Sequence, residues 1–232
     1  MLSPKKRSGI LSLNQLKMDQ VVVSLFGIAQ KQFLYSILWI TAVVIFSYRY
    51  IDLPIARYFY TLKGSWIEHL FHAITMAGNS LPYIFISLFG YCFFRYFRSN
   101  EKKANGFMLV FLAVALSGII TDIMKWIMGR YRPQKYFDDS LYGFDFFHFK
   151  AAYTSFPSGH TTTAFALAMM LSFLFPRFQW VWWFFAIVIG VSRIILSQHY
   201  VSDVICGAYI GVLSVMFILE KRKNLGILFV NN

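Results

Sequence analysis

Six stretches of the chain are almost entirely apolar, and most polar and charged residues lie between them. These stretches are Phe33–Phe46, Leu81–Phe97, Phe107–Met124, Thr161–Phe175, Trp180–Leu196 and Val204–Leu219. A helix that crosses a bilayer needs about 20 mostly apolar residues, so several stretches must extend into their polar flanks. Aromatic residues such as Tyr48 and Tyr50 gather at these ends, as is typical of the membrane interface. The pattern predicts an all-α integral membrane bundle of six transmembrane helices.

The composition agrees with a membrane protein. Hydrophobic residues make up 58% of the chain and charged residues 14%, whereas globular domains have about 45–50% and about 25%. This excess of apolar side chains excludes an ordinary soluble domain, because only lipid accepts so much apolar surface. Cys92 and Cys206 lie inside apolar stretches, which favours buried thiols over a structural disulfide.

The chain divides into three parts. We expect a cytoplasmic or interfacial segment at 1–32, a six-helix membrane domain at 33–220 and a cytoplasmic tail at 221–232. The first segment has basic residues followed by an apolar stretch at 21–29, as a signal peptide would, but no convincing small-residue cleavage site follows. We therefore interpret it as an interfacial helix that lies on the membrane.

The distribution of positive charge predicts the orientation. The formal net charge is +12, but the basic residues lie between long apolar stretches, which disfavours nucleic acid as a partner. With a cytoplasmic N-terminus, 13 of the 22 Lys and Arg residues fall inside and nine outside, which agrees with the positive-inside rule. Two long loops, at 48–80 and 125–159, would then face outwards. We expect the second to be an irregular loop with short helical pieces.

The second of these loops begins with a cluster of cations. Lys125 lies near the end of an apolar stretch, where a cation is costly unless an anion approaches it. Arg132 has a planar guanidinium that matches two phosphate oxygens, and Pro133 is expected to end the helix beside it. For Arg130 and Lys135, contacts with lipid headgroups are an equally good interpretation.

The same loop ends with the sequence Pro157-Ser158-Gly159-His160, followed by an apolar helix. Free N–H groups at the start of a helix form an anion site, and Gly159 lets the backbone approach the anion closely. His160 would lie at the edge of this site, where it can act as an acid or a base. The alternative is a capped helix with a histidine in a purely structural role.

A third cluster contains Arg193, His199 and Asp203. His199 and Asp203 are four residues apart, which places them on one face if both belong to a helix. A carboxylate that accepts from one imidazole nitrogen leaves the other free to act as a nucleophile. A structural pair that joins two helices is the competing interpretation. On the predicted topology, all three clusters lie at the same membrane face.

Together these clusters resemble the type 2 phosphatidic acid phosphatase superfamily, which includes bacterial acid phosphatases and vanadium haloperoxidases. Its three motifs are Lys-x6-Arg-Pro, Pro-Ser-Gly-His and Ser-Arg-x5-His-x3-Asp. This chain matches every motif position between 125 and 203, in the same order. The matching residues are Lys125, Arg132, Pro133, Pro157, Ser158, Gly159, His160, Ser192, Arg193, His199 and Asp203.

The resemblance implies a role for each motif residue. His199 would attack phosphorus and form a phosphohistidine, Asp203 would orient it, and His160 would protonate the leaving oxygen. The phosphate oxygens would be bound by Lys125, Arg132, Ser158, Gly159 and Arg193. Cations from the protein would replace a metal, so we expect no metal and no other cofactor. His69 and His72 lack a third ligand nearby and are interpreted as loop residues.

The leading hypothesis is a bacterial inner-membrane phosphatase with its active site at the outer face. The substrate would be a lipid phosphate or diphosphate, with lipid A phosphate and undecaprenyl diphosphate equally favoured. Phosphatidylglycerol phosphate is an alternative substrate, and lipid-to-lipid phosphotransfer is an alternative reaction. A lipid-binding or transport protein is the non-enzymatic alternative, which the intact histidines disfavour. The expected partners are the lipid phosphate and the surrounding membrane lipids.

Overall fold

The computed structural model describes residues 30–148 and 150–222, and within these ranges it contains helices and connecting loops but no strand. The main helices are α2 (Gln30–Phe46), α3 (Asp52–Tyr60), α4 (Trp66–Thr75), α5 (Ser80–Cys92), α6 (Glu101–Met128), α7 (Pro133–Asp139), α8 (Gly159–Leu174), α9 (Gln179–Ile195) and α10 (Val201–Lys221). Short π-helical and 3₁₀ segments connect several of them. The predicted all-α membrane bundle is confirmed. Most of the predicted interfacial segment lies outside the described residues.

Five helical segments are long and apolar enough to cross a membrane. They are Phe33–Tyr60, Trp66–Phe97, Glu101–Met128, Pro176–Ile195 and Val201–Lys221. The other predicted crossing is α8, which has only 16 residues. A helix of that length spans about 24 Å, somewhat less than the hydrocarbon core of a bilayer. The α8 helix packs against α6, α9 and α10 and forms the centre of the bundle.

The prediction of a long loop at 48–80 is wrong. The chain continues from α2 through a π-helical segment, Ser47–Ile51, into α3, and then forms α4 and α5. His69 and His72, which we expected in this loop, lie on α4. Polar residues interrupt the apolar pattern here and suggested a loop. Several of them instead face other helices, because Asp52 and Thr75 are buried.

Small residues let α8 and α10 approach each other closely. A β-carbon on Gly207 would lie 2.6 Å from the carbonyl oxygen of Ser158, and one on Gly211 would clash with the carbonyl oxygen of Thr162. Close backbone approach of this kind is typical of packed membrane helices. Further from the site, Leu109, Ala113, Ala166, Met170, Val215, Ile218 and Leu219 form a buried apolar core. The close contacts at Gly207 and Gly211 hold the first turns of α8 against α10.

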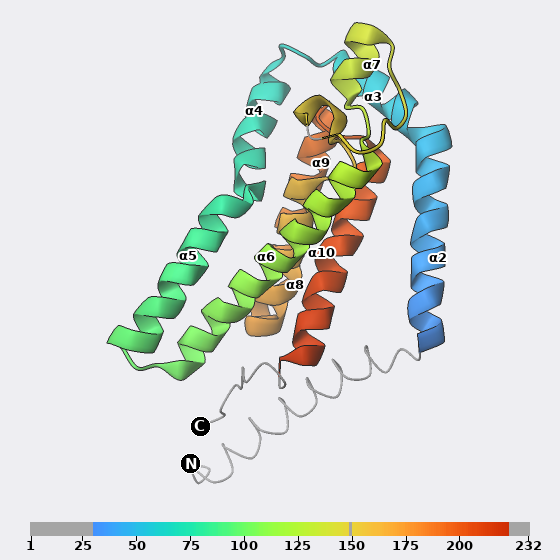
Figure 1. Cartoon of the computed structure of the whole chain (residues 1–232). Coiled ribbons are helices and arrows are strands. Elements are labelled where there is room, and N and C mark those ends of the chain that lie inside the picture. The colour runs from blue at the N-terminus through green and yellow to red at the C-terminus, as the bar shows by residue number, and fades with distance from the viewer. Residues whose placement is uncertain (1–29, 149, 223–232) are drawn as a thin grey trace.

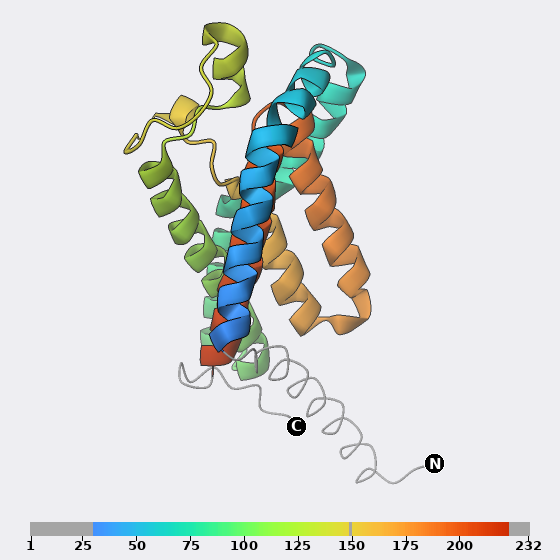
Figure 2. The same ribbon diagram turned by 90° about the vertical axis from the view of Figure 1, so that its right-hand side faces the viewer.

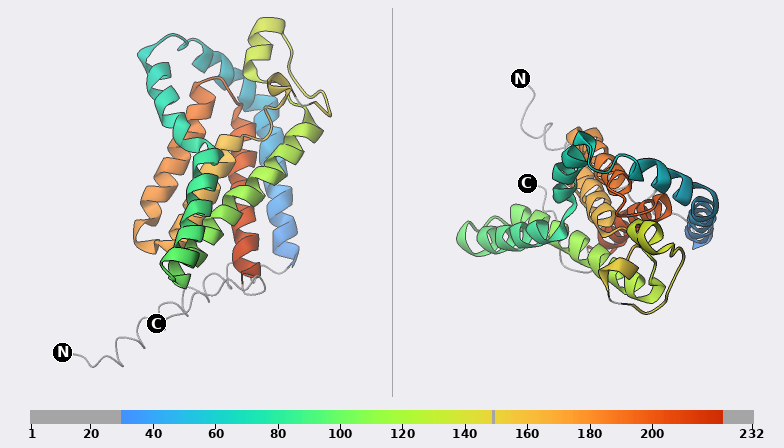
Figure 3. Two further views of the ribbon diagram at one scale, coloured as in Figure 1. Left: turned by 60° about the vertical axis from the view of Figure 1, so that its left-hand side comes forward. Right: turned by 90° about the horizontal axis from the view of Figure 1, so that it is seen from above.

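The helices are arranged so that all the motif residues lie at one end of the bundle. In Figure 1, α2 stands on one side and the α4–α5 pair on the other, while α6 crosses the bundle diagonally. The start of α2 and the end of α10 lie at the opposite end from α3 and α7, as an even number of crossings requires. Figure 2 shows α7 and its loop projecting beyond α6. In the view from above in Figure 3, α5 extends to one side of the bundle and α2 lies on the opposite side.

Candidate active site

The first motif is positioned by a tight turn at the end of α6. The helix ends at Met128, and Gly129 has a φ of +54°, a left-handed conformation that favours glycine. A side chain on Gly129 would also clash with the carbonyl of Asp145. The prediction that Pro133 ends this helix is wrong. Pro133 instead begins α7, where its fixed φ suits the first helical turn. Arg132 therefore lies in an extended connection between two helices.

Three cations from three different elements face each other at the site. The amine of Lys125 lies 3.0 Å from where a β-carbon on Gly159 would be, so it touches the start of α8. A nitrogen of Arg132 donates to Gln198 Oε1 at 2.9 Å, and one of Arg193 donates to Thr75 Oγ1 at 2.8 Å. These cations are close enough to repel one another.

The charges of this cluster are only partly compensated. The carboxylate nearest to Lys125 is that of Asp122, which is 3.8 Å away and exposed. The Nε atoms of Arg132 and Arg193 are buried and have no hydrogen-bond partner in the part of the chain that the structure describes. Burial lowers the pKa of Arg132, although Asp203 raises it. We name Lys125, Arg132 and Arg193 the cation cluster, and its free N–H groups suit an anion with several oxygens.

The second motif brings the start of α8 to the same place. Ser158 is fully buried and precedes Gly159, the first residue of α8. Its backbone N–H donates to the carbonyl oxygen of Asp203 at 3.1 Å, and its hydroxyl accepts from Thr161. His160 packs against Gly78 and interacts electrostatically with all three members of the cation cluster. The start of α8 and an imidazole thus border the cation cluster, as the motif predicted.

The third motif has a different local structure from the one we expected. Because α10 begins at Val201, His199 and Asp203 do not share one helix. Asp203 folds back over the helix start, where its Oδ2 atom accepts from the N–H of Tyr200 at 2.8 Å. This leaves Oδ2 3.5 Å from His199 Nδ1. The shorter bond of Nδ1, 2.7 Å, goes to the carbonyl oxygen of Ser155, which sequence analysis did not identify.

These contacts determine the protonation of His199. Both neighbours of Nδ1, a carbonyl and a carboxylate, are acceptors, so Nδ1 must carry the hydrogen and Nε2 is left unprotonated. Burial, together with Arg132 and Arg193, lowers the pKa of His199 to about 3 although Asp203 raises it. The imidazole is therefore neutral at pH 7, which is the state that a nucleophile requires.

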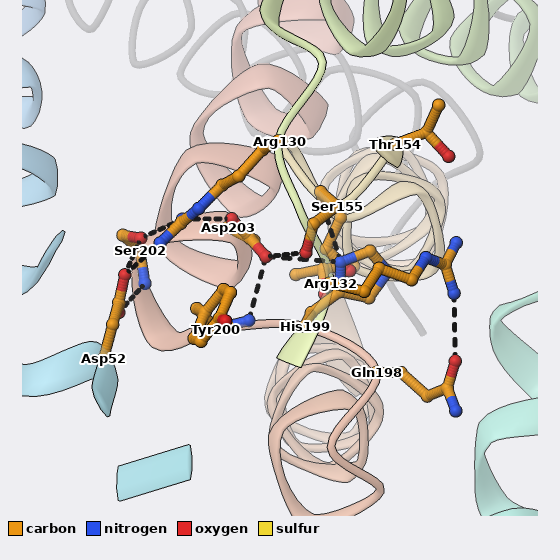
Figure 4. Close-up of polar contacts among 12 residues, drawn as sticks. Asp52, Arg130, Arg132, Thr154, Ser155, Gln198, His199, Tyr200, Ser202 and Asp203 are labelled. Carbon is orange, nitrogen blue, oxygen red and sulfur yellow. Dashed lines mark hydrogen bonds and ion pairs between the residues drawn. The ribbon is translucent and has the colours of Figure 1, made fainter. Parts of the chain in front are cut away.

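Arg130 occupies a buried ion-pair network, so its interpretation as a lipid-headgroup contact is wrong. It is fully buried and forms ion pairs with Asp203 and, at 2.6 Å, with Asp52. Figure 4 shows this network on one side of His199, and Arg132 with Gln198 on the other. Lys135, for which we gave the same interpretation, instead pairs with Asp139 on the exposed surface of α7.

Four residues around the site were missed by sequence analysis. Thr75, Ser155 and Gln198 contact motif residues, and Asp52 contacts Arg130 and Ser202 beside Asp203. Only one of them carried a usable signal. A carboxylate next to an apolar stretch, such as Asp52, is expensive in a membrane and therefore indicates a partner. Thr75, Ser155 and Gln198 are ordinary polar residues in segments that we expected to be loops.

Comparisons with known proteins agree on one family. The sequence pattern of the PAP2 superfamily matches residues 106–226. The chain is 32% identical over 178 residues to the lipid A 1-phosphatase of Rhizobium johnstonii, which covers 72% of each protein. Its structure is similar to that of Aquifex aeolicus LpxE, with a TM-score of 0.55, 24% identity, and coverage of 73% of this chain and 95% of that one.

A second solved structure is also similar. It is the PAP2-type phosphatidylglycerolphosphate phosphatase from Bacillus subtilis, with a TM-score of 0.58 and 23% identity, and the match covers 84% of this chain and 96% of that one. At this level of identity, both solved structures establish the fold and leave the substrate open.

Proposed function

Since this chain belongs to the PAP2 superfamily, we propose that it is a membrane lipid phosphatase that acts through a phosphohistidine on His199. The observation that carries this proposal is the position of His199. Its Nδ1 atom is held by two acceptors, its second nitrogen is unprotonated, and the cation cluster lies beside it. A neutral nucleophile next to fixed positive charge is the arrangement that phosphoryl transfer requires.

The proposed reaction has two steps. First, Nε2 of His199 forms a bond to phosphorus while the bond from phosphorus to the lipid oxygen breaks, and the protonated imidazolium of His160 gives a proton to that oxygen and becomes neutral. Then water attacks phosphorus, His160 takes its proton, and the N–P bond breaks to release inorganic phosphate. The cation cluster, with Ser158 and the Gly159 N–H, stabilises the charge on the equatorial oxygens in both steps. Asp203 and the Ser155 carbonyl keep His199 in its reactive tautomer.

The proposed substrate is the phosphate of lipid A. Support comes from the relatives named lipid A 1-phosphatase in two Rhizobium species and in Porphyromonas gingivalis. Phosphatidylglycerol phosphate is the second candidate, which the sequence similarity to phosphatidylglycerophosphatase B of Bacillus subtilis favours. Undecaprenyl diphosphate has weaker support, because the bacitracin transport permease BcrC matches over only 71 residues.

The experiment is a comparison of specificity constants for these three lipids with purified protein. We expect lipid A to have the highest kcat/KM, with inorganic phosphate as the product. Mass spectrometry of the lipid products distinguishes hydrolysis from phosphotransfer, which would move phosphate onto a second lipid. Phosphate release from none of the three lipids would contradict the proposed function.

The hydrophobic bundle should also contribute to recognition. A headgroup at the end of the bundle can reach the cation cluster without entering hydrocarbon, while its acyl chains contact the apolar helices. We therefore expect a much higher kcat/KM for a long-chain lipid phosphate than for its water-soluble headgroup analogue. Equal specificity constants would argue against a lipid substrate.

The protein is a multi-pass bacterial membrane protein, and we place its active site at the outer face of the inner membrane, with both termini in the cytoplasm. The excess of Lys and Arg on the opposite side supports this orientation. Ser140, at the end of α7, is exposed and suited to a test. After Ser140→Cys, a membrane-impermeant thiol reagent should label intact spheroplasts. Labelling only after lysis would reverse the orientation.

A further inference from the structure

Arg130 is enclosed by aromatic rings, and two carboxylates among the described residues, Asp52 and Asp203, compensate its charge. Its guanidinium carbon lies 4.3 Å from the centre of the Tyr200 ring and 5.0 Å from that of Tyr48, and the rings of Tyr142 and Phe144 complete the enclosure. Although burial opposes ionisation, Asp203 and Asp52 raise the pKa of Arg130, so it stays a cation. A buried cation of this kind holds its carboxylates in one geometry, because separating them leaves an unpaired charge.

One of these carboxylates is the partner of the proposed nucleophile. The Oδ1 atom of Asp203 pairs with Arg130. Its Oδ2 atom accepts from the hydroxyl of Ser155 at 2.6 Å and from the N–H of Tyr200 at 2.8 Å, and it faces His199. Because both oxygens of Asp203 are bound, its carboxylate is held in one orientation. Its Oδ2 atom therefore stays directed towards Nδ1 of His199.

The other carboxylate comes from a distant part of the chain. Asp52 begins α3, and its Oδ1 atom accepts from the backbone N–H of Ser202 at 2.9 Å. Its Oδ2 atom pairs with Arg130 and accepts from the hydroxyl of Ser202. A carboxylate at the start of a helix satisfies free N–H groups and is favoured by the helix dipole. Asp52 thus caps α10, the helix that carries Asp203.

The geometry points to Asp52 and Arg130 as positioning residues that hold Asp203, and through it His199, in line with the phosphorus atom. This inference rests on the proposed function, and it extends the site to the first described helices of the chain, which contribute no motif residue. The bonds of Asp52 go to Arg130 and Ser202, and none of the three substrate-binding cations is among its partners. Asp52 therefore acts on the nucleophile and leaves the phosphate contacts unchanged.

The test is Asp52→Asn in the full chain, assayed with the lipid phosphate that the wild-type protein hydrolyses best. The amide keeps the shape of the side chain but loses its charge. We expect kcat to fall about 10- to 100-fold, the effect of a small misplacement of a reacting group, while KM changes less than about twofold. A second variant, Ser202→Ala, removes one hydroxyl that contacts both Asp52 and Arg130 and should lower kcat in the same direction by a smaller factor.

Single-turnover quenching separates positioning from partial misfolding. If Asp52 positions His199, the rate constant for phosphohistidine formation falls in both variants while the fraction of enzyme that reacts stays as in the wild type. A lower reactive fraction with an unchanged rate constant would show a purely structural role and overturn the inference. So would an unchanged kcat in Ser202→Ala, or a higher KM with unchanged kcat in Asp52→Asn.

A matched control is Arg57→Gln, also on α3. Arg57 is exposed and donates to Tyr136, outside the network. This variant should keep the wild-type kcat and rate of phosphohistidine formation. A wild-type protein that releases no phosphate and forms no phosphohistidine would refute the proposed function itself. An active wild type with unchanged variants would refute only the positioning role.

Discussion

Arg130 and Arg132 lie two residues apart in the chain, yet they occupy opposite environments. Arg130 is fully buried and paired with two carboxylates. Arg132 donates to one neutral partner, Gln198, and pairs with no carboxylate among the described residues. Figure 4 shows the two side chains on opposite sides of His199. The same residue type therefore serves two purposes, according to which partners the fold brings to it.

The difference follows from the cost of burying charge. An ion pair in a low-dielectric interior is stable only if both partners remain, and both terminal nitrogens of Arg130 already donate to Asp52, Asp203 and Ser202. A cation with incomplete pairing is costly to the fold, but it can bind an anionic transition state strongly. The Arg130 network thus holds Asp52 and Asp203 in fixed positions, whereas the members of the cation cluster repel one another and attract phosphate. His199 lies between the two.

His199→Ala should have the largest effect. Without the imidazole there is no nucleophile, so phosphate release should fall by more than about a thousandfold, as for other groups that form covalent intermediates. The protein should still insert in membranes, because helix packing is unaffected. Phosphate release by purified protein is the measurement, and membrane fractionation is the control. Activity above about a tenth of wild type would refute the nucleophile assignment.

Arg132→Ala should weaken catalysis without weakening the fold. Loss of one fixed donor to a transition state typically costs about 100- to 1000-fold in rate. The melting temperature in detergent should not fall, because the variant removes one of three mutually repelling cations. A clear drop in melting temperature would mean that Arg132 is a structural residue like Arg130.

Arg130→Ala should destabilise the fold in addition to lowering kcat. The variant leaves Asp52 and Asp203 buried without their counter-ion, and breaking a buried pair typically costs about 3–5 kcal/mol. We expect a lower melting temperature than in Arg132→Ala, measured in the same detergent. Equal melting temperatures for the two alanine variants would contradict the distinction between paired and unpaired arginines.

An exposed ion pair should matter little. Lys135 and Asp139 lie on the surface of α7, with their charged atoms 2.5 Å apart. Solvent screens exposed pairs of this kind, so Lys135→Gln should leave both melting temperature and kcat near those of the wild type. A tenfold loss of activity would instead place Lys135 in the substrate site.

Chelation should have the smallest effect of all. The proposed mechanism relies on Lys125, Arg132 and Arg193 for positive charge, so activity in excess EDTA should equal that of the untreated protein. Loss of activity in EDTA, with recovery on adding a divalent cation, would show that these three cations are not sufficient for the reaction.

The amino-acid sequence by itself determined the membrane class, the long apolar helices and the residues of the three motifs. Apolar stretches of sufficient length must be helical in lipid, because each backbone group needs a partner within the same segment. The motif spacing likewise indicated a phosphate site before any contact was known. The predicted membrane helices are confirmed, because that inference depends on composition and on residues close together in the chain, whereas the phosphate site stays a prediction.

Only the tertiary structure decided which polar groups meet. The predicted loop at 48–80 proved helical, because its polar residues are satisfied by other helices and not by water. His199 and Asp203 meet through a turn at a helix start, and not along one helix face. Asp52 and Ser202 are 150 residues apart, and no local pattern connects them. In a low-dielectric interior the partner determines whether a charge binds a ligand or holds the fold, and partners are assigned by packing.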